Sequence, residues 1–217
     1  MWTKICGIRD VQTAQAVAEA GADAIGLNFY AQSKRVVSPA IAAKIVAAID
    51  GGCEPVGLFV NHTVDEIRTI CRQCGLQTVQ LHGDEPPEQL AELARDFRVI
   101  RAFRVGAEGL SRAGEYLAAC DRLGAMPWAS MIDAYAPGSF GGTGHTAPWE
   151  IIRREYKTAE WPPLILAGGL RPDNVAQAVA TVGPWGVDVA GGVESSLACK
   201  DPALVKQFVM NAKAGFV

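Results

Sequence analysis

Two ionisable side chains follow short apolar runs and are of the types that transfer protons. Cys6 ends the run Thr3–Cys6, where Lys4, two residues earlier and so on the same face of a strand, helps to lower the pKa of the thiol. Asp133 ends the run Ala129–Asp133, a costly place for a carboxylate unless it serves a ligand or caps the next loop. A thiol and a carboxylate across one pocket provide the acid and the base of a proton-transfer isomerisation. Taken singly, Cys6 also fits a role in inert packing, and Asp133 also fits a role as a cap of the next loop.

Two glycine-rich segments after later apolar runs have the composition of a phosphate site. The first begins with Gly168 and Gly169, and the second contains Ala190, Gly191 and Gly192. Backbone N–H groups that no side chain shields can converge on a dianion, and the N-terminus of a short helix can add to them. A need for glycine in a tight turn would explain the glycines of either segment alone, but it explains the presence of both segments less well. We therefore expect these five residues to bind a phosphate group.

The spacing of cysteines and histidines argues against a metal site. Cys71 and Cys74 form a C-x-x-C motif, but no second pair follows at the spacing of a zinc finger. The three histidines, His62, His82 and His145, lack paired acidic neighbours at ligand spacing. The six cysteines lack the density and the signal peptide of a secreted disulfide framework, so free thiols are expected. No metal or other cofactor is predicted.

Length and charge limit the class of protein. A chain of 217 residues, 49% of them hydrophobic, fits one globular α/β domain that spans residues 1–217. Twenty basic residues against 23 acidic ones, without a basic run, make nucleic acid an unexpected partner. The N-terminus enters an apolar run at Trp2–Ile5, and no apolar stretch approaches the roughly 20 residues of a membrane helix. We predict a cytoplasmic protein with a small-molecule partner and no membrane contact; its oligomeric state stays open, with a monomer as one option.

Short apolar runs alternate with Ala-rich segments of helical period from one end of the chain to the other. The predicted strands are Thr3–Cys6, Ala24–Asn28, Pro55–Val60, Thr78–His82, Val99–Phe103, Ala129–Asp133, Leu164–Ala167 and Gly186–Val189. The predicted helices are Val11–Ala20, Pro39–Ile49, Val64–Cys74, Pro87–Asp96, Gly109–Ala119, Trp149–Tyr156, Pro172–Val182 and Pro202–Ala214. Pro39, Pro172 and Pro202 stand in first helical turns, behind Ser38, Arg171 and Asp201 as caps.

The strands lack polar alternation and every return between them is helical, so they are parallel. Eight nearly even units predict a closed (β/α)8 TIM barrel in preference to an open doubly wound sheet. In a barrel the C-terminal ends of the strands build the active site. Cys6, His82 and Asp133 end the first, fourth and sixth predicted strands, and the two glycine-rich segments follow the seventh and eighth. The barrel therefore gathers all the candidate groups at one end.

These positions, taken in order, resemble the phosphoribosylanthranilate isomerase family. The matching segments are Lys4–Ile8, Gly21–Phe29 with Ser33–Arg35, Val56–Asn61, Val79–Gly83, Asp133 with Gly141–Gly144, Leu166–Leu170, and Gly186–Val189 with Gly192–Glu194. The resemblance covers nearly the whole chain. It implies conversion of N-(5-phosphoribosyl)anthranilate into 1-(2-carboxyphenylamino)-1-deoxyribulose 5-phosphate in L-tryptophan biosynthesis. This Amadori rearrangement of a small phosphorylated substrate requires neither metal nor coenzyme.

The resemblance also implies roles for single residues. Asp133 would be the acid that protonates the ribose ring oxygen, and Cys6 the base that takes the C2′ proton. Arg35, which otherwise looks like surface charge, would pair with the anthranilate carboxylate through bidentate hydrogen bonds. His82 takes a binding or positioning role, although a hydrogen bond to a loop would explain it equally well. Lys4 completes the candidate substrate-binding residues.

Three departures from the family pattern bear on phosphate affinity. His145 stands where a lysine is common, Ala190-Gly191 replaces two serines, and Ser196–Cys199 replaces a Pro-Gly pair. The nearest rival is the histidine-pathway isomerase that performs the same rearrangement, but it uses an aspartate where this chain has Cys6. A catalytically silent barrel that senses a phosphorylated ligand is the second rival, and a turnover assay separates it from an enzyme.

Overall fold

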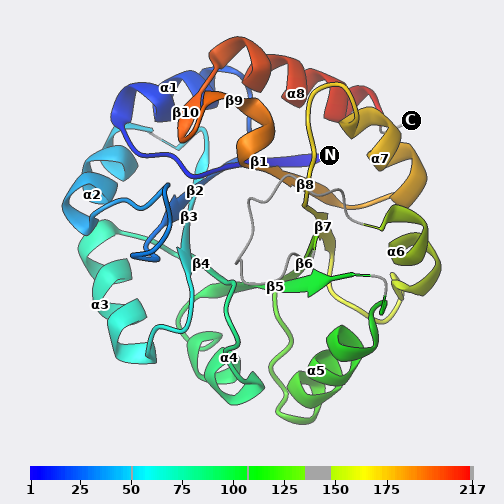
Figure 1. The fold of residues 1–217 in the computed structure, drawn as a ribbon. Helices are drawn as coiled ribbons and strands as arrows, with labels where there is room; N and C mark the ends of the chain where they lie inside the picture. The colour runs from blue at the N-terminus through cyan, green and yellow to red at the C-terminus, as the bar shows by residue number, and fades with distance from the viewer. Residues whose placement is uncertain (50, 107, 135–147, 216–217) are drawn as a thin grey trace.

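The computed structural model describes residues 1–49, 51–106, 108–134 and 148–215. Within these ranges, eight parallel strands close into a barrel in chain order, with β1 paired to β8. Figure 1 shows the strands at the centre and the helices in a ring around them. The strands are β1 Trp2–Cys6, β2 Ala24–Asn28, β3 Glu54–Phe59, β4 Thr78–Leu81, β5 Arg98–Val105, β6 Ala129–Ala134, β7 Leu164–Leu166 and β8 Gly186–Val189. The predicted (β/α)8 barrel is confirmed.

The helices alternate with the strands along the described chain. They are α1 Val11–Glu19, α2 Pro39–Ala48, α3 Val64–Cys74, α4 Pro87–Leu93, α5 Ser111–Arg122, α6 Trp149–Glu155, α7 Val175–Val182 and α8 Pro202–Ala214. Two predicted caps are confirmed, because the Ser38 side chain accepts from the Ile41 N–H and Asp201 accepts from the N–H groups of Ala203 and Leu204. None of the described helices is long and apolar enough to cross a membrane.

Apolar side chains pack in two layers. The larger cluster fills the space between the strands and the helices and includes Ile25, Phe59 and Phe208, all fully buried. The smaller cluster fills the inside of the barrel with Ala24, Val56, Ile100, Ala102, Ala129, Met131, Ile165 and Ala167. Successive residues of a strand point to opposite faces, so strands such as β2, β3, β5 and β6 contribute to both layers. The interior is therefore a packed core on which the site rests.

Three tryptophans cover the N-terminal end of the barrel. Trp2 and Trp128 pack against the interior cluster, and Trp185 stacks on Trp2 with ring centroids 5.3 Å apart. Trp128 meets Trp2 and Trp185 edge to face, at 6.2 and 5.3 Å. These rings shield the interior at this end, and the site lies at the opposite end.

Helix α7 begins at Val175, so the predicted start at Pro172 is wrong. The Asn174 carboxamide accepts from the Arg171 N–H at 2.8 Å and donates to the carbonyl of Gly169 at 3.0 Å. These hydrogen bonds hold the residues before the helix in a turn against the loop after β7. Arg171 is therefore part of that turn and not a cap of the helix.

Two other helix boundaries also differ from the prediction. Helix α5 begins at Ser111, later than the expected Gly109, because Gly109 has φ +77° and a right-handed helix cannot include that conformation. Helix α4 ends at Leu93 and is capped by Ala94, so it stops short of the predicted end at Asp96.

The segment after β8 contains structure that the hydrophobic pattern does not predict. A 3-10 helix, η1, covers Gly191–Val193, and a hairpin follows as β9 Glu194–Ser196 and β10 Cys199–Lys200. Ala198, in the turn of this hairpin, has φ +62°. In Figure 1 the hairpin lies between α1 and α8, close to β1. The hairpin places Glu194 and Lys200 beside the loop after β8.

Candidate active site

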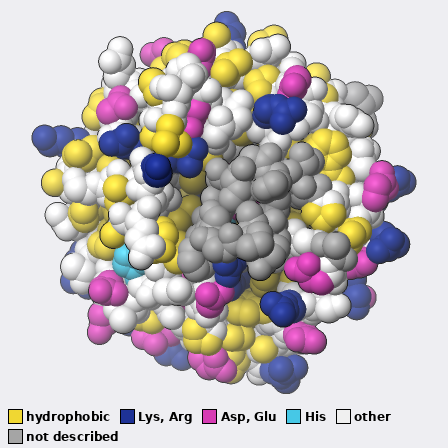
Figure 2. Space-filling view, in the orientation of Figure 1, with side chains coloured by type: hydrophobic (Ala, Val, Ile, Leu, Met, Phe, Trp, Pro, Cys, Tyr) yellow, Lys and Arg dark blue, Asp and Glu magenta, His cyan; other side chains and the backbone are white. Residues whose placement is uncertain are grey.

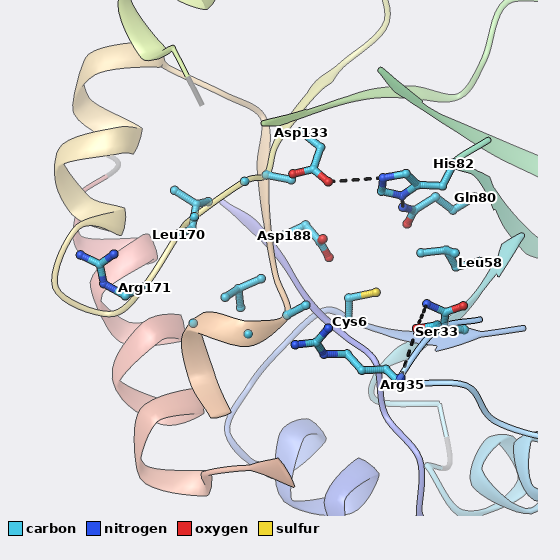
Figure 3. Close-up of a pocket in the computed structure, with 18 residues that line it drawn as sticks. Cys6, Ser33, Arg35, Leu58, Gln80, His82, Asp133, Leu170, Arg171 and Asp188 are labelled. Atoms are coloured by element: carbon cyan, nitrogen blue, oxygen red, sulfur yellow. Dashed lines mark hydrogen bonds and ion pairs between the residues drawn. The ribbon is translucent and has the colours of Figure 1, made fainter. Parts of the chain in front are cut away.

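A cavity of about 330 Å³ opens at the C-terminal ends of the strands. Figure 3 shows side chains from β1, β3, β4, β6 and β8 facing it together with the loops after β2 and β7. Acidic and basic side chains are interspersed around the rim of this face in Figure 2. Most of the predicted site residues line it, namely Cys6, Arg35, His82, Asp133, Gly168, Gly169, Ala190, Gly191 and Gly192.

Cys6 is buried at the end of β1, and Gly26 on the neighbouring strand makes room for it. A Cβ at Gly26 would stand 2.7 Å from the Cys6 sulfur. Burial raises the pKa of the Cys6 thiol, the Lys4 ammonium opposes that rise, and Asp188 adds to it. Lys4 thus acts in the predicted direction, but burial outweighs it.

Lys4 lies outside the lining of the cavity. Its side chain is fully buried and donates to an Asp188 carboxylate oxygen at 2.8 Å. Burial is the largest single influence and disfavours the ammonium, but Asp188 and Cys6 together outweigh it and raise the pKa of Lys4. Lys4 therefore remains charged beside Cys6, and its role in substrate binding stays a prediction.

Asp133, near the C-terminal end of β6, lies beside the imidazole of His82. It is 6% exposed, and one of its carboxylate oxygens lies 3.3 Å from Nε2 of His82. The amide nitrogen of Gln80 lies 2.9 Å from Nδ1 of His82. An amide nitrogen only donates, so a neutral His82 accepts at Nδ1 and carries its hydrogen on Nε2. Nε2 lies at ion-pair distance from Asp133 but makes no hydrogen bond among the described residues.

Arg35 reaches the cavity from the loop after β2. Its backbone N–H donates to Ser33 Oγ at 3.1 Å, and the Asn28 amide donates to the same oxygen at 3.0 Å. Its guanidinium donates from Nε and Nη2 to the two carboxylate oxygens of Glu194 at 2.7 and 2.8 Å. Glu194 also accepts from Lys200 at 2.8 Å. Burial would raise the pKa of Glu194, but its hydrogen bonds to Arg35 and Lys200 lower it to about 2.

The two glycine-rich loops meet at the side of the cavity. Gly168 and Gly169 have φ +86° and +66°, a left-handed conformation that favours glycine. A Cβ at Gly192 would stand 1.9 Å from the carbonyl oxygen of Leu170, so the two loops are in direct backbone contact. Lys200 donates to the carbonyl of Ala190 at 2.8 Å and so ties the second loop to the hairpin.

Several functional groups escaped the sequence analysis as site residues. Gln80 lies two residues before His82, so strand alternation could have placed it on the same face. Asp188 is the last residue but one of the predicted strand Gly186–Val189 and could have been singled out by the reasoning applied to Asp133. Glu194 falls in a segment that carries the family resemblance, but nothing local indicates its partner Arg35, and Lys200 has no local signal. His145 and Gly141–Gly144 lie outside the described residues.

Of the cysteines away from the cavity, Cys53, Cys71, Cys74 and Cys120 are buried thiols and Cys199 is exposed. Burial raises the pKa of Cys71 to about 12, with a smaller contribution from Cys74. Burial likewise raises the pKa of Cys53 to about 12. Within the described part of the chain, no group of three or more His, Cys, Asp or Glu side chains is placed to hold a metal ion.

Comparisons with known proteins agree on one family. The family model for N-(5'phosphoribosyl)anthranilate (PRA) isomerase matches residues 3–211. The N-(5'-phosphoribosyl)anthranilate isomerase of Geotalea daltonii is 45% identical over 213 residues, which cover 97% of this chain and 95% of that protein. The chain is thus similar to this relative over nearly its whole length.

Solved structures agree with the sequence comparison. The crystal structure of phosphoribosyl anthranilate isomerase from Thermotoga maritima has a TM-score of 0.88 at 34% identity, covering 99% of both chains. A crystal structure of phosphoribosyl anthranilate isomerase in complex with reduced 1-(o-carboxyphenylamino)-1-deoxyribulose 5-phosphate has a TM-score of 0.85 at 33% identity, again over 99% of both chains.

Proposed function

The chain belongs to the N-(5'-phosphoribosyl)anthranilate isomerase family, and we propose that Cys6 and Asp133 are the base and the acid of its reaction. The reaction converts N-(5-phosphoribosyl)anthranilate, a small phosphorylated molecule, into 1-(2-carboxyphenylamino)-1-deoxyribulose 5-phosphate in tryptophan biosynthesis. It requires an acid and a base placed on one substrate. The observation that carries the assignment is that Cys6 and Asp133 line the same cavity.

The first step opens the ribose ring. Asp133 gives a proton to the ring oxygen, the bond from that oxygen to C1′ breaks, and the lone pair of the anthranilate nitrogen forms the Schiff base. The carboxyl group must be aimed at the ring oxygen when this happens. The imidazole of His82, 3.3 Å away and fixed by Gln80, supports that aim. His82 is therefore a positioning residue in this proposal.

The second step removes a proton from carbon. Cys6, as a thiolate, takes the C2′ proton, the electrons of the C–H bond form the C1′=C2′ bond, and the C1′=N pair of the Schiff base returns to the anthranilate nitrogen. The resulting enolamine then tautomerises to the ketone. Because burial raises the pKa of Cys6, the thiolate depends on nearby cations. Lys4 and Lys200 both act in favour of the thiolate. The two ammonium groups thus assist the base.

The remaining cavity groups bind the two ends of the substrate. Backbone N–H groups of the loops at Gly168-Gly169 and Ala190–Gly192 take the phosphate, as expected for the loops after the last two strands of such a barrel. Arg35 takes the anthranilate carboxylate through charge-assisted hydrogen bonds. Binding at both ends holds C1′ and C2′ between Cys6 and Asp133.

Turnover of enzymatically generated phosphoribosylanthranilate, followed by fluorescence, tests the assignment. We expect Cys6→Ala to lower kcat by at least ~100-fold, as for loss of a positioned base. Binding of the reduced product analogue is the control for an intact site. Near-normal turnover by Cys6→Ala would remove Cys6 from the mechanism. A wild-type protein that binds the analogue without turning over the substrate would be a sensor.

We also propose a cytoplasmic location, on the ground of the biosynthetic role of the family. A single domain over residues 1–217 and a monomeric state are the simplest expectations, and size-exclusion chromatography with light scattering tests the second.

A further inference from the structure

Glu194, the first residue of β9, is held by hydrogen bonds on both carboxylate oxygens. Its side chain is 5% exposed. Besides the two bonds from Arg35, it accepts from Lys200 Nζ at 2.8 Å and from the Ala198 N–H at 3.1 Å. A carboxylate has about four acceptor sites, and all of them are used here. Glu194 is therefore fixed in place, because a movement with Arg35 would break its hydrogen bonds to the other partners.

The aliphatic part of the Arg35 side chain is confined as well as its guanidinium. A Cβ at Gly7, where φ is +85°, would stand 2.5 Å from Arg35 Cδ. A Cβ at Gly191 would stand 3.3 Å from Arg35 Nη2. The side chain thus passes over two glycines that leave it space, and Figure 3 shows its guanidinium directed at the cavity beside Cys6. Arg35 lines the cavity, whereas Glu194 does not.

Glu194 occupies one edge of the Arg35 guanidinium, and a second edge can bind a ligand. A guanidinium has five N–H donors, and the Nε–Nη2 edge is occupied by Glu194. The Nη1–Nη2 edge keeps a pair of parallel donors, which is the arrangement that a carboxylate accepts bidentately. We propose that Glu194 is a positioning residue that holds one edge of Arg35 so that the other faces the substrate carboxylate. This inference rests on the proposed role of Arg35.

Two effects of Glu194 on the substrate oppose each other. Its negative charge repels the substrate carboxylate, so if charge alone mattered, Glu194→Gln would strengthen binding. If Glu194 positions Arg35, the same change would weaken binding, because Arg35 loses its fixed orientation and must be ordered when the ligand binds. Lys200 offsets part of the repulsion, since the cluster of Arg35, Lys200 and Glu194 carries a net charge of about +1 at neutral pH. The two explanations therefore predict opposite signs.

The test measures preference for the carboxylate rather than overall affinity. The two probes are the reduced product analogue and the same molecule with a phenylamino group in place of the carboxyphenylamino group, and calorimetry gives both dissociation constants. We expect the wild-type protein to prefer the carboxylate by about 10- to 100-fold, the range for a charged hydrogen bond. Glu194→Gln should lower that preference at least fivefold, roughly, and raise KM at least tenfold, roughly, while kcat falls less than about threefold.

Two further variants separate positioning from general loosening of the loop. Lys200→Arg keeps the positive charge beside Glu194 and the pairing of Arg35 with Glu194 but disturbs the bond to Ala190, so both probes should weaken in parallel and the preference should stay within about twofold. Glu194→Asp keeps the charge but shortens the side chain, so it should lose preference like Glu194→Gln. It also stands in if Glu194→Gln does not fold.

A wild-type preference in Glu194→Gln and Glu194→Asp, or tighter binding of the carboxylate probe by Glu194→Gln, would overturn the inference. The inference would then fail while the proposed function holds, provided that the wild-type protein turns over phosphoribosylanthranilate. Absence of wild-type turnover would instead overturn the proposed function. Equal wild-type affinity for the two probes would overturn the role of Arg35, and this inference with it.

Discussion

Gly192 lies where the two phosphate loops touch, and a methyl group there would force them apart. A Cβ at this position would stand 1.9 Å from the carbonyl oxygen of Leu170 and 2.9 Å from its carbonyl carbon. Both are backbone atoms, so no rotation of a side chain relieves the clash. One loop must retreat by about 1.1 Å to restore a contact of 3.0 Å. A misplacement of about 1 Å in groups that bind a substrate can cost about 100-fold in rate.

We therefore expect Gly192→Ala to lower kcat/KM by roughly 100-fold, chiefly through KM, and to weaken competitive inhibition by inorganic phosphate. The matched control is Gly52→Ala, which lies outside the cavity and whose Cβ would meet no atom within 4 Å. Its effect should therefore stay below about fivefold. Thermal unfolding of both variants checks that the barrel is intact. Phosphate inhibition of Gly192→Ala at the wild-type constant would refute the assignment of these loops.

Three further outcomes test the groups around the substrate. Asp133→Asn should abolish turnover, because an amide cannot protonate the ring oxygen, yet calorimetry should find the reduced product analogue bound within about tenfold of wild type. Arg35→Met should weaken that analogue by ~1.5–3 kcal/mol, and unchanged affinity would place Arg35 outside the site. Because burial raises the pKa of Cys6, the rate at which iodoacetamide alkylates the Cys6 thiol, followed on its peptide by mass spectrometry, should still be rising beyond about pH 8, since only the thiolate reacts. A rate that has levelled off by neutral pH contradicts a raised thiol pKa.

The barrel itself is predictable because its strands and helices are specified locally. Apolar runs without polar alternation give the buried parallel strands, and Ser38 and Asp201 before prolines give two helix starts that the structure confirms. The same reasoning fails at Pro172, where it expects α7 to begin. There the side chain of Asn174 bonds to the backbone of Arg171 and Gly169, and the helix begins only after it. A local hydrogen bond from side chain to backbone overrides the signal of the proline.

The candidate site is predictable as far as position along a strand determines it. Cys6, His82 and Asp133 end predicted strands, and closure of the barrel brings them to one cavity. The hairpin that carries Glu194 and Lys200 follows no such rule. Glu194 meets Arg35 across 159 positions of the chain, and neither residue has a neighbour in sequence that indicates the other. Long-range ion pairs of this kind become visible only in three dimensions.

The ionisation of Cys6 depends on a contact that closure of the barrel makes. Lys4 and Asp188 are directly paired in the register of β1 and β8, and their side chains form an ion pair at 2.8 Å. Strand alternation places Lys4 on the face of Cys6, but its carboxylate partner belongs to the last strand. Without β8, the ammonium would act on the thiol with no competing carboxylate, whereas in the closed barrel Asp188 pushes the pKa of Cys6 upward. The reactivity of Cys6 is therefore a property of the closed barrel, and the segment Thr3–Cys6 alone does not contain it.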